Sequence, residues 1–245
     1  MRGGGSGEPV LLLVHGLGAT GEVWDRWWPL LDASWPGRWL APDLPGHGGS
    51  DPLDRYSFGG LAARLADLLE PGTRVVVLGH SLGGVVGLAL ATGWFGVTVE
   101  TVVGLGIRVS WTADELARAA VLAARPVAWY STRDEAAARH LRVSGLAGLL
   151  DGDDTAIAAG LREERGRWRL AMDPAAFGVG APDMPGLLAA ARSRVVLARG
   201  EHDPMVTDDQ LIRLHPTTAT LAGLGHNAHV EDPAAVLHLL GAYVR

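Results

Sequence analysis

The stretch RVVVLGHSLGG, residues 74–84, carries the strongest structural signal in this chain. Its first part, 74–78, is a β-branched apolar run of strand length, and an apolar helical segment follows over 85–91. Between them, GHSLG (residues 79–83) has the G-x-S-x-G pattern, which places a serine on a sharp turn from strand to helix. The strained backbone of such a turn requires very small residues on either side. The pattern therefore predicts that Ser81 is exposed at the end of a buried strand.

Other short apolar runs recur along the chain and alternate with helical patterns. Helical spacing of leucines over 61–69 follows Ser57, which suits a helix N-cap, and the segment 234–244 follows Pro233, which suits a first helical turn. Continuously apolar strands that alternate with helices are typical of a sheet covered on both faces. We therefore predict a mostly parallel, doubly wound α/β sheet, with strands at 10–14, 39–41, 74–78, 99–104, 194–198 and 218–221.

The alternation of strands and helices stops between residues 108 and 192. This stretch is rich in Ala, Arg and Glu, and it contains helical runs such as 113–124 and 133–142 but no clear strand. We predict that 108–192 forms an inserted helical lid, and that 1–107 and 193–245 together form the core. A lid covers a reactive site and excludes water from it.

A general base and a carboxylate follow the last two predicted strands. Asp203 comes a few residues after the strand at 194–198, and His226 follows the strand at 218–221. A serine hydroxyl is too weak an acid to attack unaided, so a histidine must take its proton and a carboxylate must orient that histidine. Hydrolases with the G-x-S-x-G turn carry these residues in the order Ser, Asp, His. We predict a catalytic triad of Ser81, Asp203 and His226.

Other side chains compete for these roles. Asp208 and Asp209 are alternative acids, but they lie where a helix is predicted to begin, and there a negative charge has a structural explanation. His202 is an alternative base, although neighbours on a strand-to-loop segment point in different directions. The remaining histidines near the motifs are expected to pack or form hydrogen bonds around the site: His15, His47, His80 and His229.

Two main-chain N–H groups are needed to bind the oxyanion that forms when an ester carbonyl is attacked. Leu82, directly after the nucleophile, is predicted to supply one of them. The second is assigned to Leu17 in the segment HGLG (residues 15–18), which directly follows the first core strand.

Four residues are candidates for contact with the substrate. Trp24 lies just after the oxyanion segment, where core packing is the simple alternative. Arg108 follows the strand that enters the insertion, at the sheet edge where ligands bind in α/β proteins. It could meet a substrate carboxylate or pair with an acidic residue of the lid. Trp111 and Trp129 lie in the lid and are candidates for the lining of an apolar pocket.

The chain resembles the α/β-hydrolase fold superfamily over nearly its whole length, and within it the branch of serine esterases and enol-lactonases. The motifs that carry the resemblance are HGLG (15–18), PDLPGHGGS (42–50), GHSLGG (79–84), GEHDP (200–204), and GH with EDP (225–226 and 231–233). The family's sheet begins with two antiparallel strands, but only nine residues precede Val10 here. We expect those strands to be reduced or absent.

The motifs and the resemblance predict a serine hydrolase that cleaves a small-molecule carboxylic ester or lactone through an acyl-enzyme on Ser81, with no cofactor. One alternative is a relative with different chemistry, namely a perhydrolase, an acyltransferase, or a carbon–carbon bond hydrolase or lyase. Another is a ligand-binding protein that keeps the triad.

Composition removes several other classes of function. The chain has no Cys and no Lys, which excludes a thiolate metal site, a Cys nucleophile, Schiff-base chemistry and a P-loop lysine. No histidine pair has metal-ligand spacing, so no metal is expected. The 21 basic and 27 acidic residues give a net charge of −6 without a long basic run, which argues against nucleic-acid binding. No leader or long apolar segment is evident, so we expect a cytoplasmic protein without a membrane partner.

Overall fold

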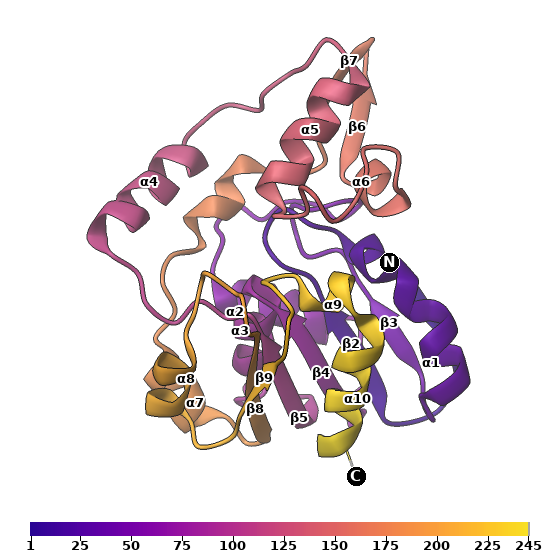
Figure 1. Ribbon diagram of the computed structural model, residues 1–245, viewed down its shortest axis with the longest axis vertical. Helices are drawn as coiled ribbons and strands as arrows, with labels where there is room; N and C mark the ends of the chain where they lie inside the picture. The colour runs from indigo at the N-terminus through magenta and orange to yellow at the C-terminus, as the bar shows by residue number, and fades with distance from the viewer. Residues whose placement is uncertain (245) are drawn as a thin grey trace.

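The computed structural model describes residues 1–244, and a seven-stranded sheet forms its centre (Figure 1). The strand order is β1-β3-β2-β4-β5-β8-β9, and every neighbouring pair is parallel except β1 with β3. The predicted mostly parallel sheet is confirmed. The strands are β1 (Arg2–Gly4), β2 (Val10–Val14), β3 (Trp39–Ala41), β4 (Arg74–His80), β5 (Thr98–Leu105), β8 (Arg194–Gly200) and β9 (Thr218–Leu221).

The antiparallel part of the sheet is small. Within the described residues, one short strand, β1, precedes β2 and pairs with β3 over Arg2↔Ala41 to Gly4↔Trp39. This agrees with the expectation that the N-terminal antiparallel strands are reduced.

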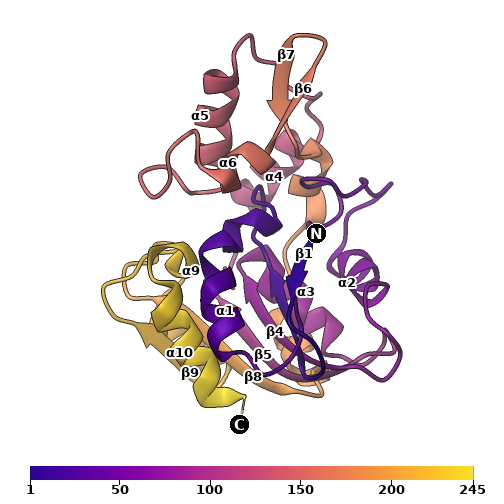
Figure 2. The same ribbon diagram turned by 90° about the vertical axis from the view of Figure 1, so that its right-hand side faces the viewer.

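Helices cover both faces of the sheet (Figure 2). Side chains alternate between the faces of a strand, so Leu12 of β2 packs into one apolar cluster and Leu11 into the other. A continuously apolar strand is thus buried on both sides. The first cluster is closed by α2 (Phe58–Ala66), α3 (Leu82–Leu90), α7 (Met184–Ala190) and α8 (Asp208–Leu214), and the second by the 3-10 helix η1 (Gly21–Trp27), α1 (Trp28–Ser34), α9 (Ala228–Glu231) and α10 (Pro233–Tyr243).

Most of the chain between β5 and β8 lies above the carboxyl edge of the sheet (Figures 1 and 2). Its elements are α4 (Ala113–Ala123), α5 (Arg133–Val143), α6 (Thr155–Ala159), β6 (Leu161–Glu164), β7 (Arg167–Leu170) and the 3-10 helix η2 (Pro174–Val179). The helix α4 buries none of its residues and packs mainly against η2. We use "lid" for these elements together.

The structure differs in two respects from the prediction that 108–192 forms a helical lid. β6 and β7 form an antiparallel hairpin, which turns at Arg165 and Gly166, both with positive φ. These strands are only four residues long and are made mostly of charged residues, so they lack the apolar run by which the core strands were recognised. The helix α7, near the end of the range, packs on the sheet, and its Met184 lies in the same apolar cluster as α2 and α3.

None of the helices within residues 1–244 combines the length and the hydropathy that a membrane crossing requires.

Candidate active site

Ser81 lies on the sharp turn between β4 and α3 at the carboxyl edge of the sheet. Its backbone has φ 50° and ψ −115°, in the left-handed region that side chains rarely adopt. The N–H of Ser81 donates to the carbonyl oxygen of Leu105 in β5, at 2.8 Å, which ties the turn to the neighbouring strand. A strained backbone held in this way indicates a functional position.

The glycines of GHSLG make this turn possible. A Cβ atom on Gly79 would collide with the carbonyl oxygen of Gly83, and a Cβ atom on Gly83 would collide with the carbonyl oxygen of Val14 in β2. The first glycine lets the chain fold back on itself, and the second lets α3 begin directly against the end of β2. The helix therefore begins directly after Ser81, with its positive end at the serine.

His226 and Asp203 form a hydrogen-bonded pair at the same edge of the sheet. The Nδ1 atom of His226 lies 3.0 Å from Oδ2 of Asp203, whose side chain is buried. The other carboxylate oxygen accepts the N–H of Met205 at 2.8 Å, which fixes the orientation of the carboxylate. Gly106 passes beside the pair, and a Cβ atom there would stand 3.1 Å from Nδ1 of His226. The absent side chain leaves room for the pair above β5.

The imidazole of His80 supports the His226 segment from below. Its Nε2 atom lies 3.0 Å from the carbonyl oxygen of His226, and because a carbonyl only accepts, Nε2 is the protonated nitrogen. Burial, and then the neighbouring rings of His229 and His226, lower the pKa of His80 well below its usual value. His80 is therefore a neutral hydrogen-bond donor. The sequence had predicted only that it packs or forms a hydrogen bond near the site.

Two buried histidines brace the segment HGLG. Nε2 of His15 accepts the N–H of Leu44 at 2.9 Å, and Nε2 of His47 accepts the N–H of Gly18 at 3.2 Å. Burial is the main cause that lowers the pKa of His15, and burial with the nearby His15 ring lowers the pKa of His47 to about 3. Both rings are thus neutral acceptors. Through them, the loop that contains PGHG (residues 45–48) and the segment HGLG (residues 15–18) hold each other in place.

The N–H groups of Leu17 and Leu82 are available to a ligand. Both residues line the pocket that contains Ser81 and His226. Within residues 1–244, neither N–H has a hydrogen-bond partner. Unpaired N–H groups on both sides of a serine are suited to hold a negatively charged oxygen.

Arg199, at the end of β8, shapes the loop that carries Asp203. Its guanidinium donates to the carbonyl oxygens of Glu201 and Asp203, at 2.8 and 3.2 Å, and to Oδ1 of Asp208 at 3.0 Å. Thr220 also donates to Asp208. The hydrogen bonds from Thr220 and then from Arg199 lower the pKa of the Asp208 carboxyl group. Asp208 therefore has a structural partner away from His226, while Asp203 contacts the histidine.

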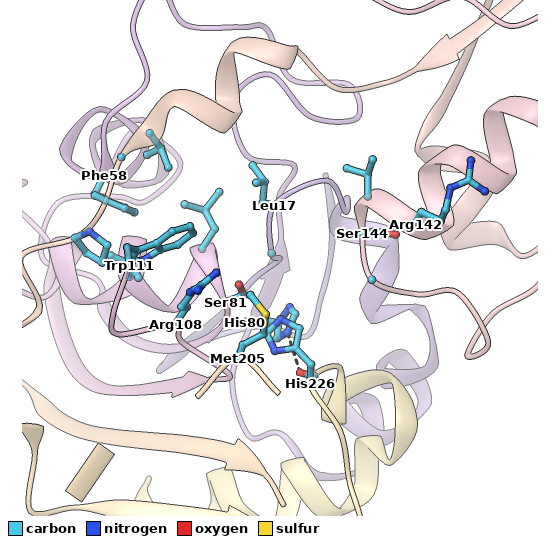
Figure 3. A pocket seen from close by; sticks show the side chains of 18 residues that line it. Leu17, Phe58, His80, Ser81, Arg108, Trp111, Arg142, Ser144, Met205 and His226 are labelled. Carbon is cyan, nitrogen blue, oxygen red and sulfur yellow. Dashed lines mark hydrogen bonds between the residues drawn. The ribbon is translucent and has the colours of Figure 1, made fainter. Parts of the chain in front are cut away.

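A pocket of about 340 Å³ opens over Ser81 (Figure 3). Phe58, Val85 and Val179 contribute to its largely apolar wall. Arg108 and Trp111 line it as the sequence suggested, with the guanidinium 4.5 Å from the centre of the Trp111 ring.

The charge of Arg108 is already matched inside the protein. Its guanidinium pairs with Glu115 of α4, and its Nε donates to the carbonyl oxygen of Ser110 at 3.0 Å. Hydrogen bonds from Thr112 and then Arg108 lower the pKa of Glu115 to about 2, so the carboxylate stays ionised. Of the two roles weighed for Arg108, the structure shows the ion pair with the lid.

Two of the predicted substrate contacts lie elsewhere, and those predictions are wrong. Trp24 is fully buried in η1 below the site, with its ring 4.5 Å from the ring of His229. Trp129 stands outside the pocket on the lid surface, where Arg167 stacks over its ring at 4.8 Å. A one-dimensional pattern of aromatic residues does not show which way η1 and the segment between α4 and α5 turn their side chains.

Sequence reasoning missed part of the pocket wall. Arg142 and Ser144, from the end of α5, lie across the pocket from Phe58 and Trp111 (Figure 3). Met205, two residues after Asp203, also lines it. The predicted helical run 133–142 could have pointed to Arg142 and Ser144, because the last turn of this helix reaches the edge of the sheet where the pocket lies.

Within residues 1–244, no group of three or more His, Asp or Glu side chains is arranged to hold a metal ion.

Two curated relatives match limited parts of the chain. The 30 kDa magnesium-chelatase subunit of Rhodobacter capsulatus is 44% identical over 88 residues, which are 34% of this chain and 30% of that protein. A pimeloyl-[acyl-carrier protein] methyl ester esterase of Neisseria meningitidis serogroup A is 40% identical over 79 residues, 32% of this chain and 24% of that protein. The match thus spans less than a third of the length of each relative.

Solved structures share the whole architecture. The thioesterase domain from the curacin biosynthetic pathway has a TM-score of 0.78 at 20% identity, covering 98% of this chain and 93% of that one. At this identity the likeness concerns the fold alone. The profile described as "Alpha/beta hydrolase family" matches residues 11–239, which include the turn at Ser81 and both members of the His226–Asp203 pair. By that match over most of its length, this chain belongs to the alpha/beta hydrolase family.

Proposed function

We propose that this protein is a serine hydrolase that cleaves a carboxylic ester or lactone through an acyl-enzyme on Ser81. The observation that carries the proposal is the pocket itself. It brings together a serine on a strained turn, a histidine hydrogen-bonded to a buried aspartate, and two unpaired N–H groups. These are the parts that acyl transfer to serine requires.

The first half of the reaction forms the acyl-enzyme. Nε2 of His226 takes the hydroxyl proton while Oγ of Ser81 attacks the ester carbonyl carbon. The N–H groups of Leu17 and Leu82 bind the resulting oxyanion, and Asp203 stabilises the imidazolium that forms. The tetrahedral intermediate then collapses, and His226 passes its proton to the departing alkoxide, which leaves as the alcohol.

The second half releases the acid. A water molecule gives a proton to His226 and attacks the acyl carbon, and a second oxyanion forms at the same N–H groups. When this intermediate collapses, the bond to Oγ breaks and His226 returns the proton to Ser81. The products are a carboxylic acid and an alcohol, or a hydroxy acid where the substrate is a lactone.

The similar proteins favour acyl chemistry of this kind. The Neisseria relative is described as a methyl ester esterase, and the curacin domain as a thioesterase. The apolar wall of the pocket over Ser81, with Arg108 neutralised by Glu115, favours an uncharged, apolar group next to the scissile bond.

Hydrolysis of p-nitrophenyl esters and of lactones of graded acyl length tests the proposal. Ser81→Ala removes the nucleophile, and we expect it to lower kcat by about 10⁴-fold or more. Ser110→Ala, at an exposed serine outside the lining of the pocket, is the matched control. Turnover that survives Ser81→Ala in the purified, folded variant would rule out the mechanism.

A further inference from the structure

A second cavity, of about 360 Å³, lies within the lid next to the pocket over Ser81. Its apolar walls come from three lid elements: Leu122 of α4, Leu170 of β7 and Phe177 of η2. Val143, the last residue of α5, lines this cavity and also the pocket over Ser81. One side chain therefore borders both spaces. We call this second space the lid cavity.

Two guanidinium groups also line the lid cavity. Arg125 follows α4 and is exposed, and Arg139 of α5 is half-buried. In the part of the chain that the structure describes, residues 1–244, neither side chain forms an ion pair or a hydrogen bond. A half-buried cation beside apolar walls loses hydration without compensation, which an anionic ligand would supply.

Some arginines in and beside the lid have partners. Arg108 pairs with Glu115, Arg169 pairs with Glu164, and Arg162 donates to the carbonyl oxygen of Gly48 at 2.7 Å. Other lid arginines, such as Arg118 and Arg167, have neither an ion pair nor a side-chain hydrogen bond within residues 1–244. What distinguishes Arg125 and Arg139 is that both line the lid cavity.

The spacing on α5 connects the two spaces. Arg139, Arg142 and Val143 stand at positions i, i+3 and i+4, which share one face of a helix. Arg139 lines the lid cavity, Arg142 lines the pocket over Ser81, and Val143 lies at the boundary. A chain that leads from Ser81 past Val143 would therefore pass toward the guanidinium groups that line the lid cavity.

We propose that the substrate carries a carboxylate at the far end of an apolar acyl chain. The ester carbonyl lies at Ser81, the chain passes Val143, and the terminal carboxylate binds Arg139 and Arg125 in the lid cavity. Guanidinium groups bind carboxylates through paired, charge-assisted hydrogen bonds. The inference rests on the proposed ester hydrolysis at Ser81 and adds the chemical class of the acyl group.

Matched pairs of activated esters test the inference. The first member of each pair is the p-nitrophenyl monoester of an α,ω-dicarboxylic acid, and the second is the p-nitrophenyl ester of the monocarboxylic acid of equal length. We expect kcat/KM for the dicarboxylic member to be at least about tenfold higher at the chain length that spans the two spaces. The advantage should shrink as salt screens the ion pairs.

Variants locate the effect. Arg139→Gln should lower the ratio of the two kcat/KM values about tenfold, and Arg139→Lys should retain part of it, since the charge remains. Arg118→Gln, an exposed arginine of α4 outside both spaces, is the matched control and should leave the ratio unchanged. A ratio at or below one at every chain length, or a ratio that Arg139→Gln does not change in folded protein, would overturn the inference.

A binding measurement separates this inference from the proposed function. In Ser81→Ala, calorimetry compares a dicarboxylic acid monoamide with the neutral amide of equal length. We expect tighter binding of the monoamide, and we expect Arg139→Gln to abolish the difference. If wild type hydrolyses no ester but this difference persists, the proposed function has failed while the carboxylate site stands. If neutral esters are hydrolysed and no difference is found, only the carboxylate site has failed.

Discussion

The imidazole of His80, the residue before the serine, donates a hydrogen bond to the carbonyl oxygen of His226 at 3.0 Å. The last residue of β4, directly before Ser81, thus also holds the main chain of the proposed base. The His229 ring packs on the His80 ring at 4.2 Å, and Trp27 donates to the carbonyl oxygen of His229 at 2.8 Å. The His226 segment is therefore positioned from beneath by a buried set of aromatic rings.

His80 is accordingly a positioning residue. His80→Ala removes the donor to the His226 carbonyl, and we expect kcat to fall about tenfold, with KM little changed, because a lost buried hydrogen bond is worth about 1–2 kcal/mol. His80→Gln, which keeps a donor, should restore part of kcat. The pH profile of kcat/KM is the diagnostic measurement, since it reports the environment of His226. If His80→Ala and His80→Gln lowered kcat equally and left the pH profile of kcat/KM unchanged, His80 would have only a packing role.

The assignment of the acid is tested by removing single charges. Asp203→Asn removes the negative charge beside His226 and no longer fixes the tautomer of its imidazole. We therefore expect kcat to fall by about 10³–10⁴-fold. His202→Ala should have a much smaller effect, because His202 is exposed and is not hydrogen-bonded to His226. Asp209→Asn, an exposed charge on α8, is the control. A larger loss in His202→Ala than in Asp203→Asn would reverse the assignment.

The neutral histidines that brace the segment HGLG (residues 15–18) make the stability of the fold depend on pH. Burial and the nearby His15 ring lower the pKa of His47 to about 3, whereas an unfolded histidine titrates near its usual value of about 6.5. Between these values the unfolded chain binds the proton and the folded chain does not. Stability is therefore highest above about pH 6.5 and falls as the pH drops, by up to about 1.4 kcal/mol per pH unit for this group.

Urea unfolding at several pH values between neutral and mildly acid measures this dependence. His47→Gln keeps an acceptor for the N–H of Gly18 without a titrating ring, so its stability should fall less steeply with acid than that of the wild type. His238→Gln, on the exposed side of α10, controls for the loss of an imidazole. A wild-type stability that does not change over this range would contradict the neutral, buried state of these rings.

The sheet and the meeting of Ser81, Asp203 and His226 could be predicted because they depend on local order. Apolar runs mark the buried strands, and the carboxyl ends of parallel strands meet at one edge, so residues just after β4, β8 and β9 come together. The turn at Ser81 leaves a pattern in the sequence because two glycines are sterically required there.

The lid could not be predicted in the same way. The helical runs 113–124 and 133–142 correspond to α4 and α5, but the short hairpin β6–β7 is made mostly of charged residues and lacks the apolar run that marks a buried strand. Trp24 and Trp129 were misplaced because their roles depend on how η1 and the segment between α4 and α5 are oriented, which is set by tertiary packing. The unpaired state of Arg139 likewise appears only when the surrounding elements are in place.

Covalent labelling with a fluorophosphonate, followed by peptide mass spectrometry, shows whether Ser81 is the nucleophile. We expect one adduct per chain, located on Ser81, with labelling slowed strongly in Asp203→Asn and absent in Ser81→Ala. Folded wild-type protein that remains unlabelled, or an adduct on another residue with Ser81 unmodified, would contradict it.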